Sequence, residues 1–322
     1  NNRLDATFAP PAESDLTPWP TDTHIESLGR DAIEAGKVGV AILNGGMATR
    51  FGGVVKGTVD VFDGRSFLEL KMHDLKQWKG RIPVFLMNSF ATHTDTIEHF
   101  KNNQMFDLNV RDIHFLIQKI SLRLTPHGDL FRGRDKAPSF YAPGHGDVFE
   151  VLAESEAFRC EQESGLQYLL ISNVDNLAAN LSAKVIGAHI YKKQKLTVEV
   201  APRNEGDKGG APVSVNGRVE IVEGFRFPPD FDHESLSVFN TNTFIANIDA
   251  IKADYPLDWF RADKVVDGED AIQFERLMGQ ITSFIAATYL IVPREGNEGR
   301  FMPIKTPKDL RRLESILRER FS

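Results

Sequence analysis

The chain has 322 residues, of which 41% are hydrophobic and 26% charged, and its 38 Lys and Arg against 45 Asp and Glu give a formal net charge of −7. This composition is typical of a globular protein and excludes intrinsic disorder for the bulk of the chain. The acidic balance, with no long run of Lys or Arg, argues against nucleic acid or an anionic membrane as the main partner.

The first residues are predicted to form an extended N-terminal arm, residues 1–25, ahead of one catalytic domain at 26–322. Four prolines fall within the first 20 residues, and apolar residues there show little periodicity. The most apolar window, 283–292, has about half the length that a helix needs to cross a bilayer, and no basic-then-apolar signal opens the chain. The single cysteine, Cys160, excludes an internal disulfide, so we expect a cytoplasmic protein.

From residue 37 onward, apolar runs typical of strands alternate with stretches of helical periodicity. The predicted elements are strand 38–43, helix 66–78, strand 83–88, helix 92–102, strand 114–118, helix 146–161, strand 168–172 and helix 182–193. The strands at 38–43 and 168–172 are apolar on both faces, as in a parallel sheet covered by helices on each side. The alternation predicts an α/β fold, in which ligands bind at the carboxyl ends of the strands.

The second half of the chain is less regular. Strand-like runs at 196–201, 218–221 and 237–244 predict a mixed extension of the sheet over the same cleft. Two further helices are expected, at 269–278 and at 307–321.

A glycine-rich loop follows the first strand. Residues 43–53 read Leu-Asn-Gly-Gly-Met-Ala-Thr-Arg-Phe-Gly-Gly, and Lys56 comes shortly after them. Glycines let backbone N–H groups approach a polyphosphate, while Arg50 can hold two oxygens and Lys56 supplies a mobile charge. The loop has neither the Gly-Lys-Ser/Thr end of a Walker loop nor the Gly-x-Gly-x-x-Gly spacing of dinucleotide-binding folds.

This loop resembles the signature loop of sugar-nucleotide pyrophosphorylases, and Leu43 and Asn44 narrow the resemblance to the UDP-glucose pyrophosphorylase family. Further segments match the family in its order: 86–90 (Leu-Met-Asn-Ser-Phe), 143–147 (Pro-Gly-His-Gly-Asp), 172–177 (Ser-Asn-Val-Asp-Asn-Leu), 208–210 (Lys-Gly-Gly), 239–242 (Phe-Asn-Thr-Asn) and 300–306 (Arg-Phe-Met-Pro-Ile-Lys-Thr). The resemblance covers about residues 38–310. It implies a GT-A-like nucleotidyltransferase fold, an α/β/α sandwich with a mostly parallel mixed sheet.

The family transfers a uridylyl group: an oxygen of a sugar 1-phosphate attacks the α-phosphorus of UTP and releases pyrophosphate. The resemblance therefore implies an enzyme that makes UDP-glucose from UTP and glucose 1-phosphate with Mg²⁺. Such transfers are accelerated by aligning two anionic reactants and by cations that stabilise charge on the leaving oxygens. The expected catalytic cations are Arg50, Lys56 and Lys305, of which Lys305 stands where the family places a lysine on the reacting phosphates.

Asp175 resembles the family's magnesium-contacting aspartate. It follows an apolar strand, where a carboxylate is costly unless it meets water or a cation. An Asx turn is the alternative interpretation.

The uracil ring offers an N–H donor between two carbonyl acceptors, and a side-chain amide can answer both kinds of group. Gln118, at the end of strand 114–118, suits that task. By resemblance, the nucleotide-binding residues are Leu43, Gly45, Gly46, Met87, Gln118 and the backbone of Gly146. Met87 is equally compatible with simple core packing.

The sugar hydroxyls need carboxylate or amide partners. The resemblance assigns sugar-binding roles to His145, Asn173, Gly210, Glu223 and Asn240. His145 has two interpretations, contact with the sugar phosphate or a cap of the helix that begins near Gly146. Asn240 is also compatible with a structural role at a sheet end.

Two departures from the family pattern bear on function. Eukaryotic members have a second lysine three residues after the first in the loop, and Val59 holds that place here. They also continue into a C-terminal β-helix that supports oligomers, whereas this sequence stops at Ser322, so we expect a short form that is a monomer or weak dimer. Two alternatives stay open: a UDP-N-acetylhexosamine or broad-specificity UDP-sugar pyrophosphorylase, and a non-catalytic regulator that binds UDP-sugars.

Overall fold

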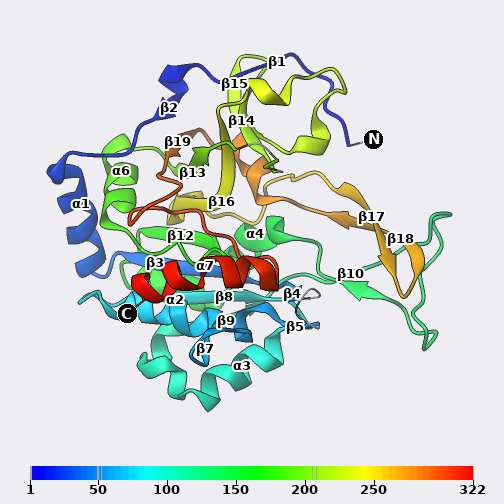
Figure 1. Cartoon of the computed structure of the whole chain (residues 1–322), viewed down its shortest axis with the longest axis horizontal. Helices are drawn as coiled ribbons and strands as arrows, with labels where there is room; N and C mark the ends of the chain where they lie inside the picture. The colour runs from blue at the N-terminus through cyan, green and yellow to red at the C-terminus, as the bar shows by residue number, and fades with distance from the viewer. Residues whose placement is uncertain (1, 49–50, 52, 205, 208, 322) are drawn as a thin grey trace.

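The computed structural model describes residues 2–48, 51, 53–204, 206–207 and 209–321. An eight-stranded sheet forms the middle layer (Figure 1). Its strands lie in the order β2 (Leu16–Thr17), β19 (Ala287–Ile291), β13 (Leu196–Pro202), β16 (Val238–Asn247), β12 (Tyr168–Asn173), β3 (Val38–Asn44), β8 (Val84–Asn88) and β9 (Ile113–Ile117). β16 is antiparallel to both neighbours, and the other pairs in this sheet are parallel. The predicted α/β class with a mostly parallel mixed sheet is confirmed.

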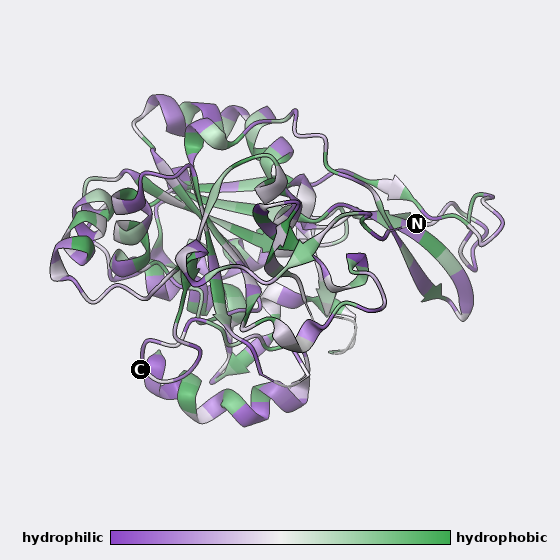
Figure 2. Cartoon of the chain, turned by 90° about the horizontal axis from the view of Figure 1, so that it is seen from above, coloured by the Kyte–Doolittle hydropathy of each residue, from purple (hydrophilic) through white to green (hydrophobic). Residues whose placement is uncertain are grey.

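Helices cover both faces of this sheet. One face packs against α1 (Thr23–Glu34), α2 (Phe67–Lys76), α6 (Ala183–Lys192) and α7 (Pro307–Arg320), with α3 (His93–Asn102) beside them. The other face packs against α4 (Val148–Glu154) and α5 (Glu156–Glu163). Figure 2 shows the strands largely hydrophobic and the outer sides of the helices hydrophilic.

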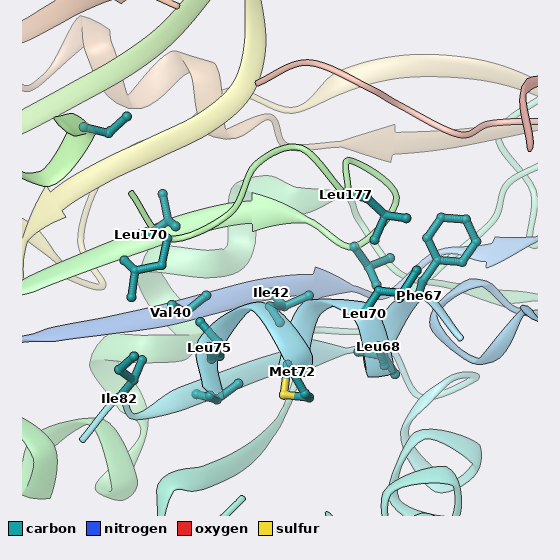
Figure 3. Close-up of a cluster of buried hydrophobic side chains, with 14 of the residues drawn as sticks. Val40, Ile42, Phe67, Leu68, Leu70, Met72, Leu75, Ile82, Leu170 and Leu177 are labelled. Carbon is teal, nitrogen blue, oxygen red and sulfur yellow. The ribbon is translucent and has the colours of Figure 1, made fainter. Parts of the chain in front are cut away.

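The central strand β3 shows why the sheet needs two helical layers. All seven of its residues are buried. Successive side chains of a strand point to opposite faces, so Val40 and Ile42 enter one hydrophobic core and Ala41 and Leu43 enter the other. In the first of these cores, α2 lies across β3 and β8, as the close-up in Figure 3 shows.

Several predicted elements differ from the structure. The predicted helix at 269–278 is wrong: β17 (Phe260–Val266) and β18 (Glu269–Glu275) form a hairpin, joined by Asp267 and Gly268, which both have positive φ. An Asp-Gly pair favours such a tight turn. The predicted helix at 146–161 is instead a 3-10 turn (His145–Asp147) followed by α4 and α5, because Ser155 caps α5 by accepting a hydrogen bond from Phe158 N.

The region predicted as an arm is partly paired. β1 (Phe8–Ala9) joins β14 (Ala211–Val215) and β15 (Arg218–Val222) in a three-stranded sheet, and β2 adds to the edge of the main sheet. The range 1–25 also includes the first residues of α1, which begins at Thr23 after its N-cap Asp22 and which the sequence pattern did not show.

Besides the β17–β18 hairpin, the described residues form three short two-stranded units outside the main sheet. They are β4 (Met47–Ala48) with β5 (Val54–Val55), β6 (Asp60–Phe62) with β7 (Arg65–Ser66), and β10 (Ser121–Leu122) with β11 (Phe140–Tyr141). The β17–β18 hairpin and the segment that follows β10 project together from the body (Figure 1). Among the described residues, no helix combines the length and the apolar character that crossing a membrane requires.

Candidate active site

A cavity of about 380 Å³ lies at the carboxyl ends of β3, β8, β9 and β12. This is the edge of the sheet at which the fold class places ligands. Its lining residues are Leu43, Gly45, Gly46, Met47, Lys56, Met87, Gln118, Ala142, Gly144, His145, Asn173, Val174 and Asp175. Nine of these are residues that we expected in the site, and segments as far apart as 43–47 and 173–175 meet here.

Gln118 and Gly45 lie against each other on one wall. The backbone N–H of Gln118 donates to Asn88 O at 2.8 Å, which fixes the residue just beyond β9. Its side-chain Nε2 donates to Gly144 O at 3.3 Å. A Cβ on residue 45 would come within 2.1 Å of Gln118 Oε1, so the buried amide can take this position because residue 45 is glycine. The wall therefore presents a fixed amide to the cavity.

Leu43 and Met87 lie beside this amide. Both are buried and belong to the hydrophobic core on the α4 face of the sheet, and both also line the cavity. For Met87 the two interpretations are thus compatible, because one end of the side chain packs in the core while the residue borders the cavity. Gly46 lines the same cavity on its open side, where a Cβ would meet no atom within 4 Å.

The segment 144–146 lies next to Gln118, whose amide donates to Gly144 O. Gly144 has φ +97°, and the Gly146 N–H donates to Arg276 O at 2.9 Å. Gly144 and His145 line the cavity, whereas Gly146 does not. The Gly146 N–H, which we expected to contact the base, is instead bonded to Arg276 O.

His145 is held in a defined orientation. Its Nδ1 accepts a hydrogen bond from Met278 N at 3.0 Å, and Gly144 is the N-cap residue of the 3-10 turn without any side-chain cap. Burial lowers the pKa of His145 to about 4, so the ring is neutral at physiological pH. A neutral ring that accepts at Nδ1 carries its proton on Nε2. The ring thus keeps a donor at Nε2, and contact with the sugar phosphate stays a prediction.

Lys56 and Asp175 form an ion pair across the cavity, with Lys56 Nζ 3.4 Å from Asp175 Oδ2. Lys56 opens a short 3-10 helix (Lys56–Thr58), and its ammonium group lies over the rings of Phe51 and Phe67. Asp175 follows β12, and its backbone oxygen accepts from Ile304 N at 3.0 Å. A cation and a carboxylate therefore lie in direct contact at the cavity wall.

The residues fit Mg²⁺ in one specific way. Within the described ranges, no group of three or more His, Cys, Asp or Glu side chains could hold a metal ion. Mg²⁺ commonly binds through one or two carboxylates together with substrate phosphates and water. Asp175, partly exposed at the cavity wall, suits that mode, in which the nucleotide supplies the remaining ligands.

The residues just before Lys305 are bonded to Asp175 and its neighbour. Ile304 N donates to Asp175 O, and Pro303 forms a β-bridge with Asn176. The Lys305 side chain, however, lines a second cavity of about 1050 Å³ between residues 294–306 and α7. Arg50 lies outside the described residues.

The predicted sugar-binding residues form a connected polar chain. Asn240 N donates to Gly210 O at 2.8 Å, and Asn240 Oδ1 accepts from Asn242 N at 2.9 Å. The Asn242 side chain donates to Asn173 Oδ1 at 3.0 Å, and Asn173 lines the cavity. The chain therefore runs from the cavity toward Gly210, although Gly210, Glu223 and Asn240 do not line the 380 Å³ cavity themselves.

Glu223 lies at the far end of this chain. The Gly210 backbone bonds to its carboxylate, and a Cβ on Gly210 would approach Glu223 Oε1 to 3.0 Å. Burial raises the pKa of Glu223, although Arg226 and the Gly210 N–H oppose that rise. A desolvated carboxylate at this position has the acceptor capacity that sugar hydroxyls require.

Two features of the site were not visible in the sequence. A register shift in the β13–β16 pair after Glu199 leaves two extra residues, Thr241 and Asn242, in β16, and such bulges re-aim side chains. Asn242 has φ +59°, a conformation that Asn adopts more readily than most residues.

Arg276 is the second feature. Its guanidinium bonds to Asp147 and Glu150 and lies over the ring of Trp259, and its carbonyl receives Gly146 N. It thus holds the segment 144–147 from a position 129 residues later than Asp147. No local pattern marks such a partner.

Val59 does not face the cavity. It is partly buried and packs against the core formed with α2. Cys160 is exposed on α5 and does not line the cavity.

Known proteins are similar to this chain over most of its length. The model of the family described as UTP--glucose-1-phosphate uridylyltransferase matches residues 12–319. The curated protein of that name from Astragalus penduliflorus is 32% identical over 304 residues, covering 87% of this chain and 62% of the relative. The one from Musa acuminata is 32% identical over 94% of this chain and 66% of its own length. The chain thus spans less than two thirds of the length of these relatives.

Solved structures show the same fold. UDP-glucose phosphorylase from Trypanosoma brucei superimposes with a TM-score of 0.79 at 26% identity, covering 96% of this chain and 70% of the other. A UDP-glucose pyrophosphorylase mutant from Leishmania major in complex with UDP-glucose gives a TM-score of 0.72 at 25% identity, covering 92% and 70%. A UDP-N-acetylglucosamine pyrophosphorylase from Entamoeba histolytica gives a TM-score of 0.83 at 18% identity, covering 94% and 84%, a likeness of fold alone.

Proposed function

Because the chain belongs to the UTP–glucose-1-phosphate uridylyltransferase family, we propose that it forms a UDP-sugar and pyrophosphate from UTP and a hexose 1-phosphate, with glucose 1-phosphate as the preferred sugar. The observation that carries the proposal is the Lys56–Asp175 pair, 3.4 Å apart in the same cavity as the Gln118 amide. A nucleoside triphosphate needs a group that recognises its base and charged groups that bind its phosphates and metal. Gln118 and the Lys56–Asp175 pair supply these groups at the carboxyl ends of the strands.

The reaction is a direct displacement. An oxygen of the sugar 1-phosphate forms a bond to the α-phosphorus of UTP, and the bond from that phosphorus to the bridging oxygen of pyrophosphate breaks. The electron pair leaves with pyrophosphate, so no side chain needs to become covalently attached. Catalysis then depends on positioning and on stabilising the charge that develops on phosphate oxygens.

Lys56 provides the positive charge in this scheme. Its ammonium group lies 3.4 Å from Asp175 without substrate and would move its interaction to a phosphate oxygen once UTP is bound. Asp175 would hold Mg²⁺, which when bound withdraws electron density from the phosphate oxygens. Lys305 would approach the phosphates from the neighbouring cavity, since the residue before it, Ile304, donates to Asp175 O.

The uracil ring would lie against Gln118. The amide is fixed by Gly144 on one side and fits against Gly45 on the other, so its donor and acceptor keep constant directions. A fixed amide discriminates strongly because a base that cannot pair with it leaves a buried polar group unsatisfied. The hexose would lie toward Asn173, where Asn242, Asn240, Gly210 and Glu223 form the connected polar chain.

A coupled assay of pyrophosphate release tests the proposal. UTP is combined with glucose 1-phosphate, galactose 1-phosphate and N-acetylglucosamine 1-phosphate, each with Mg²⁺ and with excess chelator. We expect release that requires Mg²⁺ and is fastest with glucose 1-phosphate. Fastest release with the acetylated sugar would replace glucose by a hexosamine, and UTP binding without any release would support a binding protein in place of an enzyme.

A further inference from the structure

A lysine lies buried beneath the site. Lys71 is on α2, is 5% exposed, and is flanked by the buried residues Leu70 and Met72, which Figure 3 shows against β3 and β8. An ammonium group taken out of water is costly unless its hydrogen bonds are satisfied. Burial is the main reason why the pKa of Lys71 is lowered, partly opposed by the Asp74 carboxylate one turn further along the helix.

The Lys71 ammonium group bonds to two residues that bracket the loop carrying Asp175. Nζ donates to Ser172 Oγ at 3.3 Å and to Ala179 O at 2.7 Å. Ser172 lies near the end of β12 and is fully buried, whereas Ala179 lies beyond the turn that follows Asp175. One side-chain nitrogen therefore ties together both ends of the segment 173–178.

Further hydrogen bonds connect the same segment to β3 and to residues 300–304. Val174 N donates to Leu43 O at 3.1 Å, and Ile304 N donates to Asp175 O at 3.0 Å. The Asn176 side chain donates to Arg300 O at 3.1 Å and accepts from Met302 N at 2.9 Å. These bonds secure the loop to β3 and to residues 300–304, and the Lys71 bonds secure it to α2.

We propose that Lys71 is a positioning residue, which fixes the Asp175 loop from inside the core so that the carboxylate points into the cavity. The catalytic importance of this loop rests on the function proposed above, whereas its immobilisation by Lys71 does not. A purely apolar side chain of similar length would pack in the same space and avoid the cost of a buried charge. A lysine at this position is explained if its hydrogen bonds to Ser172 and Ala179 are needed to hold the loop.

The first experiment measures the loop directly. Hydrogen exchange of backbone amides 173–179 is followed by mass spectrometry in the wild type, in Lys71→Met and in Lys76→Met. Lys76 is on the same helix but partly exposed in an ion pair with Asp107, so the same substitution there is a matched control. We expect at least tenfold faster exchange at 173–179 in Lys71→Met, unchanged exchange in β3, and wild-type exchange in Lys76→Met. Equal protection of the loop in all three proteins would overturn the proposal.

The second experiment separates positioning from stability. In Lys71→Met we expect kcat to fall at least tenfold while KM for UTP stays within threefold and the melting temperature changes by only a few degrees. Lys71→Gln, which keeps a donor, should recover part of the loss. A wild-type kcat in folded Lys71→Met would overturn the proposal. A wild type without turnover would remove the proposed function and leave the exchange result to decide the role of Lys71.

If Lys71→Met does not fold, Ser172→Ala takes its place. It removes one of the two acceptors and leaves the ammonium group its bond to Ala179 O. We then expect severalfold faster exchange at residues 173–176, and unchanged exchange would overturn the proposal.

Discussion

The side-chain oxygen of Gln118 occupies the space that a methyl group on residue 45 would need: a Cβ built on Gly45 would lie 2.1 Å from Gln118 Oε1. The amide that faces the proposed uracil site thus depends on a glycine from a different strand end. Because the amide is also held by Gly144 O, displacing it would break this hydrogen bond.

Gly45→Ala should therefore weaken the preference for UTP. We expect the wild type to use UTP far better than ATP, and we expect the kcat/KM ratio of UTP to ATP to fall at least tenfold in Gly45→Ala, because the displaced amide no longer faces the base. Gly46→Ala is the matched comparison, since a Cβ there meets no atom within 4 Å, and it should change the ratio much less. Equal ratios in both variants would show that Gln118 does not read the base.

Asp175→Ala should abolish turnover and leave the fold intact. The carboxylate lies at a cavity wall in contact with Lys56, so its removal opens no cavity in the core. If Asp175 holds Mg²⁺, we expect a loss of about 100-fold or more in kcat. Steady-state kinetics at saturating Mg²⁺ and circular dichroism test both parts, and an unchanged rate would contradict the metal role.

Lys56→Ala and Lys305→Ala should each lower kcat far more than they raise KM for UTP. A cation directed at charge that develops in the transition state acts mainly there, and its removal from a water-poor site lowers the rate by about 100- to 1,000-fold. Lys195→Ala, which removes an exposed ion pair with Asp249, is the control and should leave kcat unchanged. Wild-type kcat in both Lys56→Ala and Lys305→Ala would show that neither lysine stabilises the transition state.

Val59→Lys should destabilise the protein and should not rescue Lys56→Ala. Val59 packs partly buried against the core, so a lysine there would either bury its charge or lose the apolar contact. We expect a loss of about 1–3 kcal/mol in the free energy of unfolding, measured in urea. Recovery of activity in the double variant would show instead that a lysine at 59 reaches the phosphates.

Stability should fall as the pH is lowered from about 6.5 toward 4, partly through His189. Its ring bonds to Thr197 Oγ1 and Asn247 Oδ1, and burial lowers its pKa to about 4. In this window the unfolded chain binds a proton that the folded protein does not, so the free energy of unfolding decreases with falling pH, by a few kcal/mol in all. Urea midpoints measured between pH 7 and pH 4.5 should show a smaller decrease in His189→Leu, and an identical slope would exclude His189 as a source.

The sequence predicted the central sheet well because its signals are local. The runs at 38–43 and 168–172 are apolar on both faces, and both are buried central strands, β3 and β12. The segment 269–278 is predicted as a helix because the exposed residues of β18 hide the two-residue period, and the turn at Asp267 and Gly268 is the signal that indicates a hairpin. Helix α1 was missed although Asp22 caps it, because the prolines before it dominated that segment.

In the candidate site too, local sequence signals place some residues and not others. Residues that directly follow strands, such as Gln118 and Asp175, can be placed from the pattern once the strands are known. Arg276, Asn242 and Lys71 could not be placed, because their roles depend on partners that are distant in the chain or on a bulge within β16.

The N-terminal strands pair with segments that are made much later in synthesis. Phe8 pairs with Val215 in the small sheet, and Leu16 pairs with Tyr289 at the edge of the main sheet. A growing chain can therefore attach β1 only after β14 has emerged, and β2 only after β19 has emerged. Non-local pairings of this kind close slowly. Until then β1 and β2 have no strand partner. If β19 pairs with β13 before β2 is added, β19 has an open strand edge that can pair with other proteins.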